Sequence, residues 1–334
     1  MNSKEIKQVF KRFDGMRIMI IGDVMVDSYM WGRVDRISPE APIPIVSVNK
    51  RENRPGGAAN VALNVQALGA KPILCSVTGN DAYRQLFREM MEQSGLDSAG
   101  ILSDSKRRTT VKTRIISGNQ QLIRVDEEVN DIINRHTEKE LIEVIKKLLS
   151  SEKIDAVIFE DYDKGVITPS LIGEVREIAA GNGILLAADP KKRNFGHYRS
   201  MDLLTPNLKE LSGGLRIDID RNDIGGIEAG ARKLQENNSI RYLLVTLSEM
   251  GIYLMHNKEG TLVPTEVRDV ADVSGAGDTV IAVATACLAA GCSPRHMAMV
   301  ANLAGGQVCE KVGVVPVSKE QLLSETLINL SKTK

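Results

Sequence analysis

The 334-residue chain has no excess of charge of either sign and no long apolar run. Lysine plus arginine and aspartate plus glutamate each number 43, so the formal net charge at pH 7 is zero. This balance argues against a broad basic surface for nucleic acid or an anionic membrane, although charge can still gather in a cleft. The longest apolar stretch, residues 280–290, is far shorter than the roughly 20 residues of a membrane-spanning helix.

Cysteine and histidine are too few and too scattered to indicate a metal centre. The four cysteines include no CxxC pair, and the four histidines show no metal-ligand spacing. We therefore expect buried thiols rather than ligands or disulfides. A chain of this length buries a hydrophobic core large enough to fold without disulfide bonds or a structural metal ion.

The sequence also lacks features that would divide it or direct it out of the cell. Its length alone suggests about two domains, but no linker, repeat or low-complexity segment separates them. Residues 1–15 are polar and charged, without the apolar segment of a secretory signal. We expect a single domain over residues 1–334 and a cytoplasmic location.

Short apolar runs alternate with amphipathic helical patterns along most of the chain. The runs are typical of buried parallel strands and cover residues 17–21, 72–77, 155–159, 184–188 and 242–246. The helical patterns cover 58–68, 83–94, 137–149, 169–180 and 226–236, followed by 276–290, 294–309 and 319–330. Strands that alternate with helices predict an α/β fold with a mainly parallel sheet.

Other segments have the character of strands but break this alternation. Residues 31–48 hold short β-like pieces punctuated by three prolines, and residues 109–125 alternate around Ser117-Gly118-Asn119, a hairpin signal. Neither segment can form a core of its own, so we expect a small antiparallel sheet that projects from the main domain. Residues 252–256 and 262–267 are further strand candidates.

The strongest candidate site is the glycine-rich turn Asp272-Val-Ser-Gly-Ala-Gly-Asp-Thr279, which leads into an apolar helix. Gly275 and Gly277 let successive N–H groups face one anion at the positive end of that helix. Asp278, in the first turn, could take the proton from a hydroxyl that attacks phosphorus. Alternatively, Asp278 only caps the helix. Neither the GxxxxGK[ST] nor the GxGxxG phosphate-binding pattern occurs.

A second candidate is Thr205-Pro-Asn-Leu-Lys-Glu210, directly after an apolar pair. Asn207 and Glu210 are three residues apart, so a helix that begins here places both on one face. A carboxamide and a carboxylate so placed could hold hydrated Mg²⁺ beside phosphates. The alternative is a capping box, in which Asn207 is the N-cap and Glu210 reaches back to it.

The third candidate is Arg54-Pro-Gly-Gly-Ala-Ala-Asn60, where Gly56 and Gly57 allow a ligand to approach the backbone and Asn60 could bind a sugar hydroxyl. The alternative is a helix packed tightly on the sheet. Asp27 follows the first strand, at the edge where open α/β sheets bind ligands, although a lone aspartate there is otherwise a loop residue.

Basic residues gather in the predicted hairpin. Lys112 and Arg114 share a face because side chains alternate along a strand, and Arg124 follows in the next strand. They could bind an anionic group, or they could be a solvated edge that charge protects from aggregation.

The order and spacing of these motifs resemble the ribokinase-like (PfkB) sugar kinases, from about residue 17 to residue 321. The resemblance is closest to the heptose kinase branch, through further segments at 22–27, 36–46, 120–126, 161–165 and 188–191. It implies a ribokinase-like three-layer α/β sandwich with a β-sheet lid built from about 29–50 and 108–126. It also implies that ATP phosphorylates O1 of D-glycero-β-D-manno-heptose 7-phosphate, a step toward the lipopolysaccharide core.

The resemblance also implies the roles of individual residues. Asp278 becomes the general base, Gly275, Ala276 and Gly277 the anion hole, and Asn207 and Glu210 the organisers of Mg²⁺ through water. The nucleotide-site residues are Lys191, Thr246, Ser248, Gly251 and Asn302. The residues for the sugar hydroxyls are Asp27, Gly56, Gly57 and Asn60. The candidates for the 7-phosphate are Arg36, Lys112, Arg114 and Arg124. A monovalent cation such as K⁺ and a homodimer through the lid are further expectations.

The chain departs from the branch at several positions. Ser274 stands where threonine is commoner, Glu160 where a small serine is usual and Lys192 where glycine is usual. Residues 313–318 replace a more polar stretch at the adenine or monovalent-cation edge. No HxGH nucleotide-transfer motif occurs, so we expect another protein to carry out the adenylyl transfer.

Three other functions remain as alternatives. The first is a ribokinase-like kinase for another sugar or sugar phosphate. The second is a dinucleotide-dependent oxidoreductase, which the missing GxGxxG disfavours. The third is a sugar-binding regulator without catalytic activity. The presence of Asp278, Asn207 and Glu210 disfavours it, because such a regulator does not need these residues.

Overall fold

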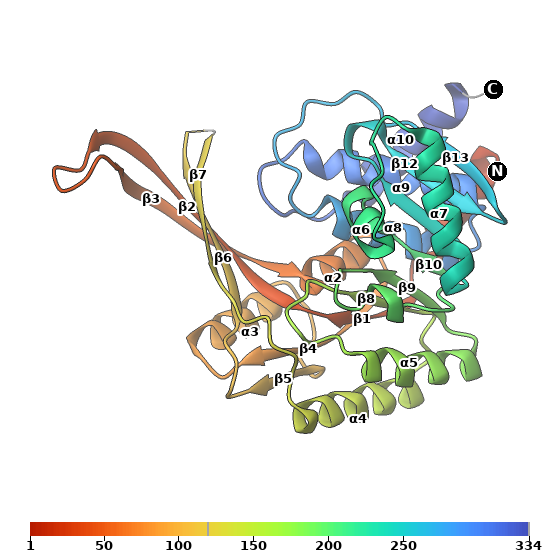
Figure 1. Ribbon diagram of the computed structural model, residues 1–334, viewed down its shortest axis with the longest axis horizontal. Helices are drawn as coiled ribbons and strands as arrows, with labels where there is room; N and C mark the ends of the chain where they lie inside the picture. The colour runs from red at the N-terminus through yellow and green to blue at the C-terminus, as the bar shows by residue number, and fades with distance from the viewer. Residues whose placement is uncertain (119, 333–334) are drawn as a thin grey trace.

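A computed structural model describes residues 1–118 and 120–332 of the chain (Figure 1). Its centre is a nine-stranded sheet in the order β13-β12-β11-β10-β9-β8-β1-β4-β5. These strands are β1 (Arg17–Gly22), β4 (Lys71–Gly79), β5 (Ile101–Asp104), β8 (Ala156–Glu160), β9 (Leu185–Asp189), β10 (Leu203–Leu204), β11 (Tyr242–Thr246), β12 (Ile252–His256) and β13 (Glu259–Val263). Every pairing is parallel except those of β12 with β11 and β13, so the predicted mainly parallel α/β sheet is confirmed.

Helices cover both faces of this sheet, as Figure 1 shows for α4 and α5 on one face and α8 and α9 on the other. The first layer consists of α4 (Arg135–Ser151), α5 (Pro169–Asn182), α6 (Leu208–Leu215) and α7 (Ile224–Asn238). The second consists of α1 (Ser3–Arg12), α2 (Ala58–Ala67), α3 (Ala82–Gln93), α8 (Ala276–Ala289), α9 (Pro294–Cys309) and α10 (Lys319–Lys332).

Strand β1 shows why two layers form. Ile18 and Ile20 point into the core cluster that contains α8 and α9, whereas Met19 and Ile21 point into the cluster beneath α4 and α5. All four side chains are fully buried. A strand buried on both faces carries no polar alternation, which explains its continuous apolar run.

A second sheet, which we call the small sheet, has the order β3-β2-β6-β7 and projects from one side of the main body (Figure 1). It consists of β2 (Val24–Ile37), β3 (Pro44–Gly57), β6 (Thr110–Ser117) and β7 (Gln120–Glu127). β2 and β3 have 14 residues each, so the short pieces predicted at 31–48 are the outer part of a long ribbon. β2 pairs in parallel with β6, so the sheet is not wholly antiparallel. Asn119, part of the predicted hairpin turn, lies outside the described residues.

Several element boundaries differ from the sequence predictions for local reasons. The strand predicted at 262–267 is β13, which ends at Val263 because Pro264 cannot donate to the ladder. The unpredicted α1 is amphipathic: Asn2 and Glu5 form a capping box, and one face buries Ile6 and Phe10.

Candidate active site

The candidate site lies beyond the carboxyl ends of three central strands. Gly22 of β1, Glu160 of β8 and Asp189 of β9 are neighbours in register at this edge. The small sheet begins one residue later, since β2 starts at Val24 directly after Asp23. Asp27 is therefore the fourth residue of β2 rather than a loop residue, and the base of the small sheet stands over the edge where open α/β sheets bind ligands.

Asp278 lies at the centre of this edge, in the first turn of α8, and is only 3% exposed. Asn60 donates from Nδ2 to Asp278 Oδ2 at 2.7 Å, and Tyr162 donates from its hydroxyl to Asp278 Oδ1 at 2.6 Å. Burial raises the pKa of the Asp278 carboxyl, and these two hydrogen bonds oppose the rise. The result is an oriented carboxylate whose basicity is higher than that of an exposed aspartate.

The turn before α8 uses two of its amide groups internally: the Ser274 N–H donates to Asp272 Oδ1 at 2.9 Å and the Ala276 N–H donates to the Val273 carbonyl at 3.3 Å. Gly275 is the N-cap, with a left-handed φ of 80°, and no side chain of the described residues caps the helix. A Cβ at Gly275 would come within 2.7 Å of Asn60 Nδ2, so both the φ and the close approach favour glycine. The start of α8 at Gly277 has no side-chain cap among the described residues, and the positive end of the helix there favours an anion.

Gly56 and Gly57 join the small sheet to the helix that carries Asn60. Gly57 is the N-cap of α2, and a Cβ at Gly56 would collide with the Asp27 carboxylate. Glycine at 56 thus lets Asp27 reach the site. The sequence predicts a ligand close to this backbone; in the structure the Asp27 side chain lies against Gly56, and a ligand there stays a prediction.

A charged cluster extends from Asp278 along the strand edge. Lys191 Nζ lies 2.7 Å from Glu210 Oε1 and 3.3 Å from Asp189 Oδ2. Burial opposes the charge of this ammonium, but the two carboxylates outweigh it and raise the pKa of Lys191. Burial also raises the pKa of Asp189 to about 7, although Lys191 acts in the opposite direction.

Glu160 is the most unusual member of the cluster. It is fully buried, and neither carboxyl oxygen has a hydrogen-bond partner among the described residues. Burial raises the pKa of Glu160 well above its ordinary value, and the neighbouring charges of Asp189 and Asp278 raise it further. This environment favours the neutral, protonated form of Glu160 up to a higher pH than for an exposed glutamate.

Asn207 and Glu210 form the capping box that was the alternative interpretation of their spacing. Asn207 accepts from the Glu210 N–H at 2.9 Å, and Glu210 Oε2 accepts from the Asn207 N–H at 2.9 Å. The same Glu210 binds Lys191 through its other oxygen. The two interpretations are compatible, since the cap fixes an acidic group beside the anion site.

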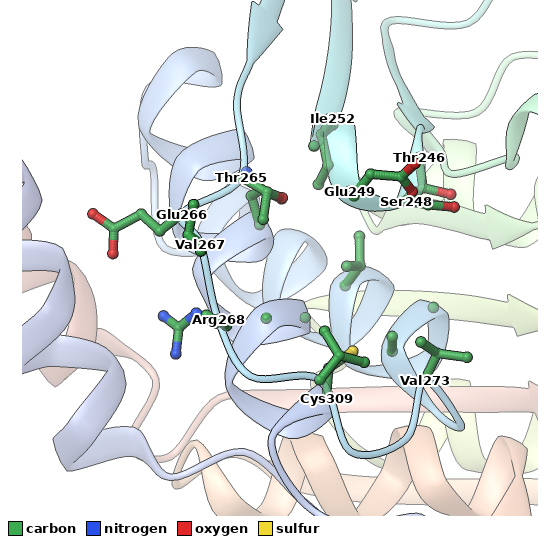
Figure 2. Close-up of a pocket in the computed structure, with 18 residues that line it drawn as sticks. Thr246, Ser248, Glu249, Ile252, Thr265, Glu266, Val267, Arg268, Val273 and Cys309 are labelled. Atoms are coloured by element: carbon green, nitrogen blue, oxygen red, sulfur yellow. The ribbon is translucent and has the colours of Figure 1, made fainter. Parts of the chain in front are cut away.

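Four of the five predicted nucleotide-site residues share one cavity of about 610 Å³ with the start of α8 (Figure 2), whereas Lys191 does not line it. Thr246, Ser248, Gly251 and Asn302 all line it, together with Ala276 and Gly277. Figure 2 shows Thr246 and Ser248 on one side and residues 265–268 on another, with Val273 and Cys309 on a third. Much of the lining is apolar, as befits the face of a flat heterocycle. The segment 265–273 was not identified from the sequence.

Three of the four basic residues expected to bind the sugar phosphate form ion pairs with acidic side chains. Arg114 forms a buried ion pair with Asp27, Lys112 Nζ lies 3.1 Å from Glu128, and Arg124 Nε lies 2.9 Å from Asp126. Burial raises the pKa of Asp27, and Arg114 opposes the rise. The guanidinium remains charged, so it favours the ionised form of the Asp27 carboxyl.

Arg36 does not come together with the others. It is exposed and lies nine residues beyond Asp27 on β2, opposite Ile45 of β3. At about 3.3 Å per residue, that distance is roughly 30 Å along the strand. Within one chain, Arg36 is therefore remote from Asp278.

Tyr162 and Asp23 are site residues that no motif argument identified. Tyr162 contacts Asp278 directly, and Asp23 accepts the backbone N–H of Tyr162 at 2.8 Å. Their segments were noted only for their resemblance to the heptose kinase branch. A signal existed, because both follow directly after strands that end at the ligand-binding edge.

Two features, a metal-binding cluster and a membrane-spanning helix, are absent from the described residues. Across residues 1–118 and 120–332, no three acidic, histidine or cysteine side chains are arranged to hold a bare metal ion. Within those same ranges, no helix has the length and apolar character needed to cross a membrane.

Comparison with known proteins agrees with this geometry. Residues 16–321 match the family described as pfkB family carbohydrate kinase. The chain is 37% identical over 328 residues to the bifunctional protein HldE of Citrifermentans bemidjiense, covering 97% of this chain and 66% of that protein. It is 39% identical over 306 residues to HldE of Helicobacter pylori, covering 92% of this chain and 65% of that protein. The chain thus spans 65–66% of the length of these relatives.

Solved structures share the fold at low sequence identity. Phosphofructokinase-2 from Escherichia coli in complex with fructose-6-phosphate has a TM-score of 0.76 and 17% identity, covering 95% of this chain and 99% of that one. Ribokinase from Thermotoga maritima has a TM-score of 0.69 and 20% identity, covering 94% of this chain and 100% of that one. These likenesses confirm the ribokinase-like fold.

Proposed function

Because the chain belongs to the pfkB family of carbohydrate kinases, we propose that it transfers the γ-phosphoryl group of ATP to O1 of D-glycero-β-D-manno-heptose 7-phosphate. The observation that carries the kinase reaction is the position of Asp278. This buried carboxylate lies in the first turn of α8, between the apolar cavity and the base of the small sheet. The heptose phosphate is favoured because identity to the HldE proteins extends over 92–97% of the chain.

In the proposed reaction, Asp278 accepts the proton of the attacking sugar hydroxyl as the oxygen bonds to the γ-phosphorus. The bond from that phosphorus to the β–γ bridging oxygen breaks, and ADP leaves. The first amides of α8 face the charge that develops on the transferred group. Alignment of the hydroxyl with the phosphorus contributes more to catalysis than covalent chemistry does. In the proposal, residues beneath the small sheet provide this alignment.

Magnesium fits the acidic edge as a water-bound ion. Glu210 and Asp189 offer carboxylate oxygens, which Mg²⁺ prefers, and Asn207 stands beside them. No described set of three such ligands forms a cage, which suits an ion held mainly by water and ATP. Bound there, the ion supplies positive charge that stabilises the phosphates. Potassium dependence is part of the proposal and is tested by assays in K⁺ and Na⁺.

The small sheet is proposed to be the lid of the site and the contact of a homodimer. Its outer part exposes several large apolar side chains: Val34, Ile37, Ile43, Val48, Leu122, Ile123 and Val125. Exposed apolar surface of this extent favours association. The basic residues of the lid, released from Asp126 and Glu128, are candidates to bind the sugar phosphate. We place the reaction in the cytoplasm, where ATP is available.

A coupled ADP-release assay tests this function with four acceptors: heptose 7-phosphate, fructose 6-phosphate, ribose and adenosine. The proposal predicts the highest kcat/KM for heptose 7-phosphate, with phosphorus NMR showing a new phosphate at O1. Preference for one of the other acceptors contradicts the heptose assignment and leaves the kinase reaction intact. No turnover with any acceptor contradicts the kinase reaction itself.

A further inference from the structure

We propose that Tyr162 is a positioning residue for phosphoryl transfer, which holds one oxygen of the Asp278 carboxylate in place for the incoming hydroxyl. The inference rests on the proposed role of Asp278 as the base. Tyr162 donates its hydroxyl to Asp278 Oδ1 at 2.6 Å, across 116 positions of sequence. It comes from the loop after β8, an element separate from the helix that carries Asp278.

The carboxylate is held from two sides. Tyr162 occupies Oδ1 and Asn60 occupies Oδ2, the latter from α2 at 2.7 Å. Two donors from different elements fix both the plane and the rotation of the carboxylate. Each oxygen has a second lone pair, so the substrate hydroxyl can approach without displacing either donor. The base is thus oriented before the substrate arrives, which lowers the entropic cost of the reaction.

The loop that carries Tyr162 is itself fixed by Asp23, a buried residue directly after β1. Asp23 Oδ2 accepts the N–H groups of Tyr162 at 2.8 Å and Lys164 at 3.1 Å, and Oδ1 accepts that of Val166 at 3.0 Å. Three hydrogen bonds to one carboxylate hold the loop in a single conformation. The Tyr162 hydroxyl therefore reaches Asp278 from a rigid support.

The hydrogen bond from Tyr162 to Asp278 has an electrostatic effect on the pKa of Asp278, and this effect can be measured. Asp278 is surrounded by other ionisable groups on several elements: Asp27 on β2, Glu160 on β8, Asp189 on β9, and Lys191 and Tyr162 in the following loops. Burial raises the pKa of Asp278, and the Tyr162 bond lowers it because the donor stabilises the ionised form. Removal of the donor must therefore move the titration of the base to higher pH.

The test compares Tyr162→Phe with Tyr198→Phe in pH profiles of kcat/KM. Tyr198 is a matched control, because it is fully buried and donates to a different carboxylate, Asp161 Oδ2, at 2.7 Å. Tyr162→Phe should move the acid limb up by about one pH unit, with about tenfold lower activity below the limb. Tyr198→Phe should leave the limb in place. Thermal unfolding shows whether each variant is folded.

An unmoved limb in Tyr162→Phe overturns the proposal, and so does an equal shift in both variants, which would indicate general loosening. If Tyr162→Phe does not fold, 3-fluorotyrosine at position 162 gives the second test. The fluorine makes the phenol a stronger donor, so the limb should move to lower pH; no movement overturns the proposal. Turnover that survives in Asp278→Asn would instead contradict the proposed base, so the two failures can be distinguished.

Discussion

Asn60 and Asp278 lie 218 positions apart in the sequence, yet their side chains meet at 2.7 Å in the buried centre of the site. Asn60 belongs to α2, which follows the small sheet, whereas Asp278 opens α8 beside the nucleotide cavity. This hydrogen bond links the helix that follows the small sheet to the helix that borders the cavity of about 610 Å³. Its donor stabilises the ionised form of the proposed base.

Replacement of Asn60 should therefore reduce turnover more than it reduces ATP binding. Asn60→Ala removes one of the two donors to Asp278, and we expect kcat to fall about 10²-fold. The KM for ATP should change little, because Asn60 does not line the nucleotide cavity. Steady-state kinetics measure both quantities. Asn182→Ala, an exposed change on α5, is the control. An equal loss of kcat in this control would contradict the role of Asn60 as a donor to Asp278.

The ion pair of Asp27 and Arg114 should be strongly coupled in stability. Arg114→Met leaves a buried, unpaired Asp27 carboxylate and should lower the free energy of unfolding by about 3–5 kcal/mol. Asp27→Asn combined with Arg114→Met should cost less than the sum of the single changes, since no unpaired charge remains. Urea denaturation of all four proteins measures the coupling. Additive effects would show that the two side chains do not interact in solution.

Glu160 should make the stability of the protein fall with rising pH. Its folded pKa is raised above the ordinary value of 4.5, so the folded state binds a proton that the unfolded state has released. The stabilisation is complete below about pH 4.5 and is lost as pH rises toward the folded pKa, at about 1.4 kcal/mol per pH unit.

Glu160→Gln removes this titration, so the free energy of unfolding should fall less steeply above pH 5; the slope that Asp189 contributes remains. Chemical denaturation from pH 5 to pH 8 compares it with the wild type and with Glu177→Gln, an exposed change on α5. Equal pH slopes in wild type and Glu160→Gln would show that Glu160 titrates normally in the folded protein.

The small sheet should carry the dimer contact. Ile123 is 54% exposed on β7, and Ile328 is 53% exposed on α10, in the main body. Ile123→Asp places a charge within the apolar lid surface and should shift the protein to a monomer in analytical ultracentrifugation. Ile328→Asp should remain a dimer. A wild-type protein that is monomeric at all concentrations would contradict the proposed contact.

Much of the main sheet was predictable because buried parallel strands have a simple sequence pattern. Residues 17–21 became β1, and the helical pattern over 169–180 became α5, which the Thr168 hydroxyl caps. The length of β2 and β3 was not predictable. Their outer residues are exposed on both faces, so no burial pattern distinguishes them from loops.

The residues of the candidate site likewise include some that the sequence predicts and some that only the fold brings together. Gly56, Asn60 and Asp278 could be identified because each belongs to a short motif in which glycines permit a particular backbone conformation, and such motifs can be recognised in a sequence. The bond from Tyr162 to Asp278 spans 116 positions and has no local pattern. The pairing of Arg114 with Asp27 likewise depends on which strands are neighbours, and only the fold determines that.

The role of Asp278 is the central claim, and Asp278→Asn tests it most directly. The amide keeps the size of the side chain, but its single oxygen can accept from only one of the two donors, Asn60 and Tyr162, and it cannot take the proton of the sugar hydroxyl. We predict that calorimetry with a non-hydrolysable ATP analogue gives a Kd close to that of the wild type, while kcat falls by about 10³-fold. Turnover within about tenfold of the wild type, in a folded variant that binds ATP, would contradict the account.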